Sequence, residues 1–151
     1  MKTRSASAAV VAALIAVLVG VFVLRQAPSE GTPHVSVTDV YASETAGDAS
    51  SMYMTFDNSG GSDDLVAVIV TGVGQVSIHD ADMRPHNHLR LKGHHTTKLA
   101  PAGGHIMLES LSSPLRPGTQ LDVRLMFKRS APIEVTADVL SYDQINQKIS
   151  S

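Results

Sequence analysis

Short stretches of alternating apolar and polar residues recur from residue 34 to residue 139, and this period of two constrains the fold more than any other feature. Alternation indicates a strand with one buried face, and clusters of Gly, Pro, Asn and Ser separate the stretches as turns. Beyond the N-terminal segment, no stretch of useful length has the period of an amphipathic helix. The expected strands are His34–Tyr41, Met52–Phe56, Leu65–Val70, Gln75–His79, His88–Lys92, His105–Glu109, Leu121–Phe127 and Ile133–Val139.

About eight short strands with turns between them predict an all-β fold, an antiparallel Greek-key β-sandwich. A chain of 151 residues has room for one such domain with a real core. We place the domain at residues 34–140, after a Pro- and Gly-containing linker at residues 26–33. Residues 141–151 are polar, and we expect a loosely ordered tail there.

The first 25 residues predict a hydrophobic helix that acts as a signal peptide or a signal anchor. Lys2 and Arg4 precede an uninterrupted small and apolar run of 17 residues, Ala8–Leu24. As a helix this run spans about 26 Å, which favours an uncleaved membrane anchor, and a cleaved signal is the alternative. The basic residues before the run orient everything after it outside the cytoplasm, in the periplasm or on the outer face of the cell membrane.

The sequence contains no cysteine, which excludes disulfides, thiolate ligands, thiol nucleophiles and a lipid-modified cysteine. From residue 28 onward, 14 acidic residues face nine basic ones, because three of the 12 basic residues come earlier. This balance argues against a nucleic-acid partner. No nucleophile elbow or phosphate-binding glycine loop is present either, so we do not expect an enzyme.

Six of the seven histidines and two of the six methionines fall between His79 and Met107. Imidazole and thioether together suit copper, because sulfur selects the soft Cu(I) ion. His105 and Met107 lie two apart on an expected strand, so their side chains leave the same face. His79 ends another strand, and Met83 follows it within a turn. Alone, each pair would more simply be an exposed histidine beside a packing methionine.

The four other histidines of this segment are also candidate ligands, and the alternative for each is a solvated side chain without a metal role. His86 and His88 share one alternating face, whereas His94 and His95 fall in an expected mobile loop. Ligation by nitrogen alone would favour Cu(II) or zinc over Cu(I).

Several segments, in this order, resemble the periplasmic copper chaperones called the PCuAC family, or DUF461. They cover most of the exported part of the chain. They are Met52–Asn58, Val76–His79 followed by Met83, Leu99–Leu108, and Leu111–Gly118 followed by Leu121–Phe127.

The resemblance implies a cupredoxin-like β-sandwich that binds Cu(I) through two histidines and two methionines. His79, His105 and Met107 match three of those ligands. The family's remaining methionine falls here on Arg90, which cannot bind metal. Three alternatives follow for the fourth ligand. Met83 is the first candidate, and His88 or His86 is the second. The third alternative is a degenerate site that binds copper weakly.

By this resemblance we expect an extracytoplasmic Cu(I) chaperone. It would pass copper to an acceptor such as a cytochrome c oxidase subunit, at the CuA site, or an assembly factor of that enzyme. The alternative is an exported β-sandwich that serves as a binding or scaffold module, with incidental binding of zinc or Cu(II) by its histidines.

Overall fold

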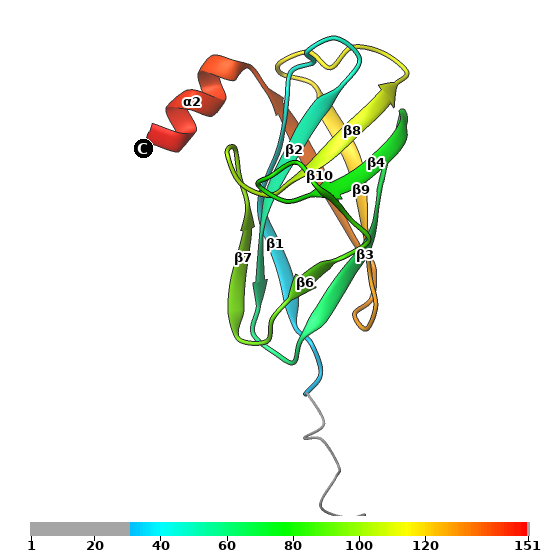
Figure 1. Cartoon of the computed structure of the whole chain (residues 1–151), viewed down its shortest axis with the longest axis vertical. Coiled ribbons are helices and arrows are strands. Elements are labelled where there is room, and N and C mark those ends of the chain that lie inside the picture. The colour runs from blue at the N-terminus through cyan, green and yellow to red at the C-terminus, as the bar shows by residue number, and fades with distance from the viewer. Residues whose placement is uncertain (1–30, 151) are drawn as a thin grey trace, which may run out of the picture. The chain divides into compact units, whose positions relative to one another are not determined.

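A computed structural model describes residues 31–150, which form ten strands followed by one helix (Figure 1). The elements are β1 (Val35–Ser43), β2 (Ser50–Asn58), β3 (Asp63–Val70), β4 (Val73–His79), β5 (Pro85–His86), β6 (Leu89–Leu91), β7 (His95–Leu99), β8 (His105–Leu111), β9 (Gln120–Phe127), β10 (Ile133–Leu140) and α2 (Tyr142–Ser150).

The strands form one continuous hydrogen-bonded path that curls into a barrel-like sandwich. Its order is β5-β4-β8-β2-β1-β10-β9-β3-β6, and β7 pairs with β2 beyond the end of β8. Where β1 meets β10, three residue pairs from Tyr41 to Ser43 run parallel to Asp138–Leu140. All other pairs are antiparallel.

The core follows the alternation seen in the sequence. On β2, Met52, Met54 and Phe56 are each at most 1% exposed, while the residues between them are half-buried. Phe56 meets Phe127 edge-to-face, with ring centroids 6.5 Å apart. On β4 and β8, Ile78 and Ile106 form a buried cross-strand pair, which directs the flanking side chains of both strands to the opposite face.

The all-β prediction is confirmed, and each of the eight expected strands is present. The strand count was wrong, because β5 and β7 were missed. A two-residue strand is too short to show alternation, and β7 was interpreted as a loop containing His94 and His95. His95 in fact pairs with Asn58, and His94 adopts a positive φ of 53° in the turn before it. The parallel contact between β1 and β10 also departs from a wholly antiparallel sandwich.

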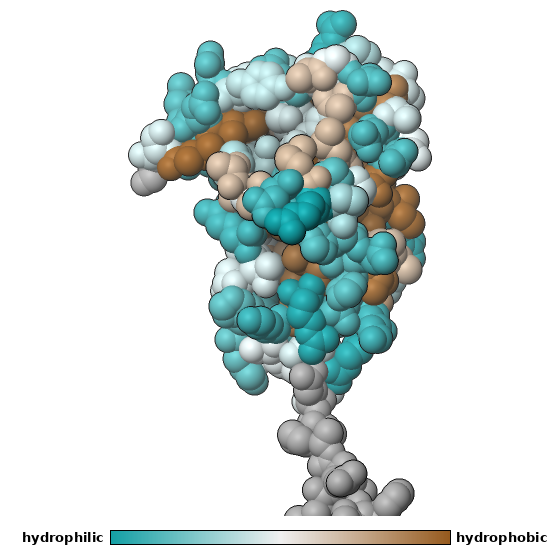
Figure 2. Space-filling view, in the orientation of Figure 1, coloured by the Kyte–Doolittle hydropathy of each residue, from teal (hydrophilic) through white to brown (hydrophobic). Residues whose placement is uncertain are grey.

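The expected loose tail is instead helix α2. A capping box starts it: the backbone N–H of Gln144 donates to the Ser141 hydroxyl, and the Ser141 N–H donates to the Gln144 side-chain oxygen. Ile145 is buried, and Lys148 lies over the Tyr41 ring at 5.4 Å and 3.4 Å from Asp39. Figure 2 shows an apolar strip along α2, where Tyr142 and Ile149 are exposed.

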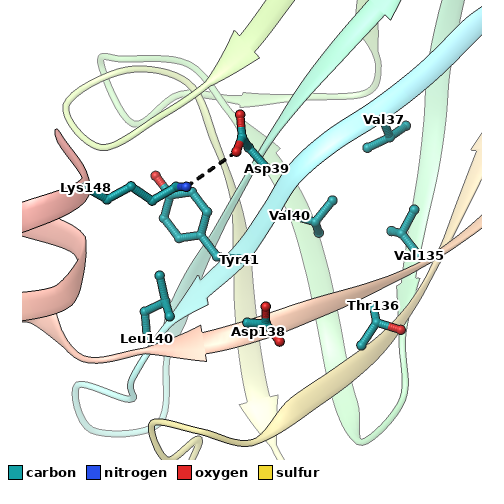
Figure 3. A pocket seen from close by; sticks show the side chains of 9 residues that line it. All are labelled: Val37, Asp39, Val40, Tyr41, Val135, Thr136, Asp138, Leu140 and Lys148. Carbon is teal, nitrogen blue, oxygen red and sulfur yellow. Dashed lines mark hydrogen bonds and ion pairs between the residues drawn. The ribbon is translucent and has the colours of Figure 1, made fainter. Parts of the chain in front are cut away.

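A groove of about 580 Å³ opens where β1 and β10 diverge (Figure 3). Val37, Val40 and Val135 line its floor, and the Lys148–Asp39 pair closes one end. Its lining contains none of the candidate ligands.

The expected N-terminal helix and the linker up to residue 30 lie outside the described residues, so both stay predictions, as do the proposed domain boundaries. Among residues 31–150, no helix has the length and apolar character needed to cross a membrane.

Candidate metal centre

His79 and His105 are brought together by the pairing of β4 with β8. They are direct cross-strand partners at the end of β4 and the start of β8. Their ring centroids lie 5.5 Å apart, with the planes tilted by 55°. His105 is only 7% exposed, and His79 is half-buried. Two residues 26 positions apart in the sequence thus form one pair of neighbouring, tilted imidazoles.

Each of these imidazoles has one nitrogen with a hydrogen-bond partner and one without. His105 donates its Nδ1 hydrogen to the Gly103 carbonyl at 3.2 Å, and Nε2 of His79 lies 3.0 Å from the Ser77 hydroxyl. Nε2 of His105 and Nδ1 of His79 are buried and unpartnered. Buried polar atoms are rarely left unpaired, so two open nitrogens on neighbouring rings mark this pair as a candidate binding position.

Met107 lies on the same face as the histidine pair. It is two residues beyond His105 on β8, and its cross-strand partner on β4 is Ser77. The four positions therefore form a square of neighbouring side chains on one face, with His79 opposite His105 and Ser77 opposite Met107. Ser77 was not among the candidate residues that the sequence singled out.

The loop before β8 holds His105 in place. Its backbone closes through hydrogen bonds from Ala100 N to Gly104 O at 3.0 Å and from Gly103 N to Ala100 O at 2.9 Å. A side chain at Gly104 would come within 3.2 Å of the His79 carbonyl and of Leu99. The small residue thus allows the loop to pack closely against β4.

Met83 sits on a tight turn that follows His79. The turn is held by the Asp80 carboxylate, which accepts hydrogen bonds from the backbone N–H groups of Asp82 and Arg84 at 2.9 and 3.0 Å. Met83 adopts a positive φ of 63°, and its side chain is 57% exposed. The turn keeps the thioether near the strand end, on a segment open to solvent.

The Asp80 carboxylate has a pKa of about 2, below its ordinary value. The hydrogen bond with His86 lowers the pKa most, and the backbone N–H of Arg84 follows. Asp80 is therefore ionised at neutral pH, where it both holds the turn and orients the His86 ring.

His86 and His88 lie in a cleft of about 440 Å³, which His79 also borders. His86 pairs with Ile78 across β4 and β5, so it leaves the sheet on the face opposite to the His79 side chain. Its Nε2 is 3.0 Å from Asp80, and Nε2 of His88 is 4.0 Å from Asp64. His86 therefore does not share the face of the His79–His105 pair, whereas His88 precedes β6 and lies outside the strand pairing that fixes these faces.

Arg90 occupies the position where the PCuAC pattern has a methionine. It lies on β6, opposite Asp64 of β3, and its guanidinium is 3.3 Å from both carboxylate oxygens. This position therefore takes part in an ion pair between β6 and β3, and its side chain lines the same cleft as His79.

His94 and His95 lie well away from the square. His95 pairs with Asn58 at one end of β2, whereas Met52, six residues earlier, pairs with Ile106 of β8. Six residues of strand span about 20 Å.

Nowhere in residues 31–150 do three or more His, Cys, Asp or Glu side chains gather in a way that could hold a metal ion. A metal bound by the His79–His105 pair would therefore need a further ligand of another kind. Met107 and Met83 are the methionines closest to that pair in the sequence, two residues after His105 and four residues after His79, and a thioether is a ligand that Cu(I) accepts.

The fold matches those of solved PCuAC domains. The copper-bound PCuAC domain from PmoF2 is 20% identical, with a TM-score of 0.66 over 71% of this chain and 92% of that one. The apo PCuAC domain from PmoF1 is 24% identical, with the same TM-score over 71% and 93%. CuI-DR1885 from Deinococcus radiodurans is 22% identical, with a TM-score of 0.59 over 78% and 85%. No curated protein sequence matches significantly.

The family model that matches residues 35–139 is LpqE-like, named after a lipoprotein. The chain belongs to this LpqE-like family. The resemblance to PCuAC proteins seen in the sequence is confirmed as one of family and fold. The 151-residue sequence has no cysteine to carry a lipid.

Proposed function

We propose that this protein is an extracytoplasmic copper-binding chaperone that carries Cu(I) on His79, His105 and Met107. The observation that carries the proposal is the pair of buried, unpartnered nitrogens on adjacent imidazoles. Copper is the cargo in this proposal and takes part in no catalysis. The similarity to copper-bound PCuAC domains supports the same cargo.

The ligand types favour Cu(I). Two imidazoles and a thioether supply the soft donors that Cu(I) prefers. A stable zinc or Cu(II) site would need further hard ligands, and residues 31–150 contain no group of three such side chains placed for a metal. We therefore favour the chaperone over the alternative of a scaffold module with incidental zinc or Cu(II) binding.

We place the fourth coordination position at the open side of the site and give it to Met83 first. Met83 is exposed on the turn that follows His79. His88 is the next candidate, because it lies in a cleft that His79 borders, and His86 is third. A degenerate site with three ligands is the remaining possibility. In each case one side of the ion stays near the surface, as transfer to an acceptor requires.

We further propose that the acceptor is a copper protein on the same side of the membrane, such as the CuA-bearing subunit of cytochrome c oxidase or one of its assembly factors. This part rests on the family resemblance. The N-terminal segment, if it stays uncleaved, would hold the domain at the membrane that contains such an acceptor.

Anaerobic titration of the full chain with Cu(I) against a chromophoric chelator tests the proposal. We expect one tight equivalent, which the double variant His105→Ala/Met107→Ala loses. A matched control, His34→Ala/Met126→Ala, removes one histidine and one methionine outside the square and should leave the affinity unchanged. Unchanged affinity in the first double variant would refute the proposed site.

The fourth ligand can be assigned with two single variants. Met83→Leu should lower the Cu(I) affinity if the thioether completes the site, whereas His88→Ala should leave it unchanged. The opposite result would assign the position to His88. Equal affinity of both variants and the wild type would indicate the three-ligand site. X-ray absorption of the copper-loaded protein, through its count of sulfur and nitrogen neighbours, gives an independent check.

A further inference from the structure

Three corners of the square on β4 and β8 are proposed copper ligands, and the fourth corner is Ser77. A serine hydroxyl is a poor ligand for Cu(I), which prefers sulfur and imidazole. The Ser77 hydroxyl is also already engaged, 3.0 Å from Nε2 of His79. The Ser77 hydroxyl thus contacts His79, a proposed copper ligand, and its effect is on how that ligand is held.

The tautomer of His105 follows from its partner. The Gly103 carbonyl has no hydrogen to give, so the 3.2 Å hydrogen bond requires a hydrogen on Nδ1 of His105. Neutral His105 therefore has a bare Nε2, and this is the buried atom without a partner. The lone pair that could bind a metal is the one on Nε2.

For His79 the surroundings favour the opposite tautomer. The Ser77 hydroxyl can donate or accept, so the 3.0 Å contact alone allows either form. If Ser77 donated, Nδ1 of His79 would carry a hydrogen, and that donor would be buried without an acceptor. If the ring donates through Nε2, Nδ1 keeps only a bare lone pair. Unpaired buried donors are rarer than under-satisfied acceptors, which favours the second form.

We propose that Ser77 is a positioning residue of the copper site: it holds Nε2 of His79, so that copper binds His79 through Nδ1 and His105 through Nε2. This inference rests on the proposed function. The two imidazoles then offer different nitrogens to one ion, as their 5.5 Å separation and 55° tilt allow. The arrangement matches the general use of hydrogen bonds to set the tautomer of ligating histidines.

The test is nitrogen NMR of the full chain labelled with 15N-histidine, first without copper. At about pH 8, where histidine side chains are mostly neutral, each tautomer is identified by its pair of ring-nitrogen shifts. We expect the Nε2–H form for His79 and the Nδ1–H form for His105. The same tautomer on both residues would overturn the inference, whatever the copper affinity.

Anaerobic addition of one equivalent of Cu(I) then identifies the coordinated nitrogens. We expect the shift changes at Nδ1 of His79 and Nε2 of His105. Ser77→Ala should move ligation of His79 toward Nε2 and lower the Cu(I) affinity about 10-fold, as loss of such a supporting hydrogen bond commonly does. Ser77→Thr keeps the hydroxyl on a β-favouring residue and should retain the wild-type nitrogens and affinity.

The outcomes separate the two proposals. Tight Cu(I) binding with His79 coordinated through Nε2 in the wild-type protein would overturn the role of Ser77 and leave the chaperone proposal standing. Absence of any Cu(I) shift at either histidine would overturn both. Because the wild-type spectra are decisive, the inference does not depend on the stability of a variant.

Discussion

Replacing His105 with leucine should not destabilise the copper-free protein, although the residue is only 7% exposed. The imidazole makes one hydrogen bond, at 3.2 Å to the Gly103 carbonyl, and buries Nε2 without a partner. Losing the hydrogen bond costs about 1 kcal/mol, and removing the unsatisfied nitrogen returns about 1 to 3 kcal/mol. Leucine fills a similar volume, so we expect a net gain of about 0 to 2 kcal/mol in the free energy of unfolding.

The assays are urea unfolding and thermal unfolding of the copper-free chain, both followed by far-ultraviolet circular dichroism. A gain of about 1 kcal/mol should raise the melting temperature by about 3 to 6 °C in a domain of this size. The matched control is His88→Leu, because His88 is mostly exposed and should change the stability by less than about 0.5 kcal/mol.

The same variant should lose all stabilisation by copper. The wild-type protein should gain about 2.7 kcal/mol when free Cu(I) reaches about 100 times its dissociation constant. His105→Leu should gain none. A loss of more than about 1.5 kcal/mol by the copper-free variant would refute the reasoning, because it would mean that Nε2 is satisfied without metal.

Three other variants test a buried carboxylate in the fold, the turn after β4 and the site itself. Asp63 is fully buried and accepts hydrogen bonds from the backbone of Asp64, Arg129 and Ser130, so Asp63→Ala should cost about 2 to 4 kcal/mol by urea unfolding. The pKa of Asp80 lies at about 2, below its unfolded value, so its contribution to stability is complete above about pH 4 and is lost as the pH falls toward 2. Unfolding of Asp80→Asn should lack this part of the acid dependence. Ser77→Met should add a thioether at the fourth corner of the square and tighten Cu(I) binding in the chelator titration, even though it removes the partner of His79.

Most of the fold could be predicted from the sequence, because a strand with one buried face has an alternating pattern of apolar and polar residues. β2 and β8 each keep a buried face against the core, and both were expected. β7 was missed because His95-Thr-Thr-Lys-Leu99 has only one apolar residue and is held by backbone pairing to β2. Helix α2 was missed although Ser141 and Gln144 have the spacing of a capping box and Tyr142, Ile145 and Ile149 recur at helical spacing, because polar residues outnumber apolar ones in this short segment.

From the sequence, the geometry of the candidate site could be predicted only where a single strand contains it. His105 and Met107 share a face by their spacing alone. The pairing of His79 with His105 depends on the register of β4 against β8, which places residues 26 positions apart side by side. A slip of one residue would have put Ile78 or Ile106 opposite an imidazole. The role of Ser77 depends on the same register and on a ring orientation, neither of which leaves a pattern in the sequence.

The buried nitrogens and the exposed turn divide the proposed site into a fixed half and an open half. The square on β4 and β8 is held by sheet pairing and by the hydrogen bonds of Ser77 and Gly103, so it needs little rearrangement to receive an ion. Met83, by contrast, is 57% exposed on a turn of its own. A ligand there can be exchanged for one from an acceptor protein while the other three stay in place. Copper would then leave through a shared intermediate, without passing as a free ion through solvent.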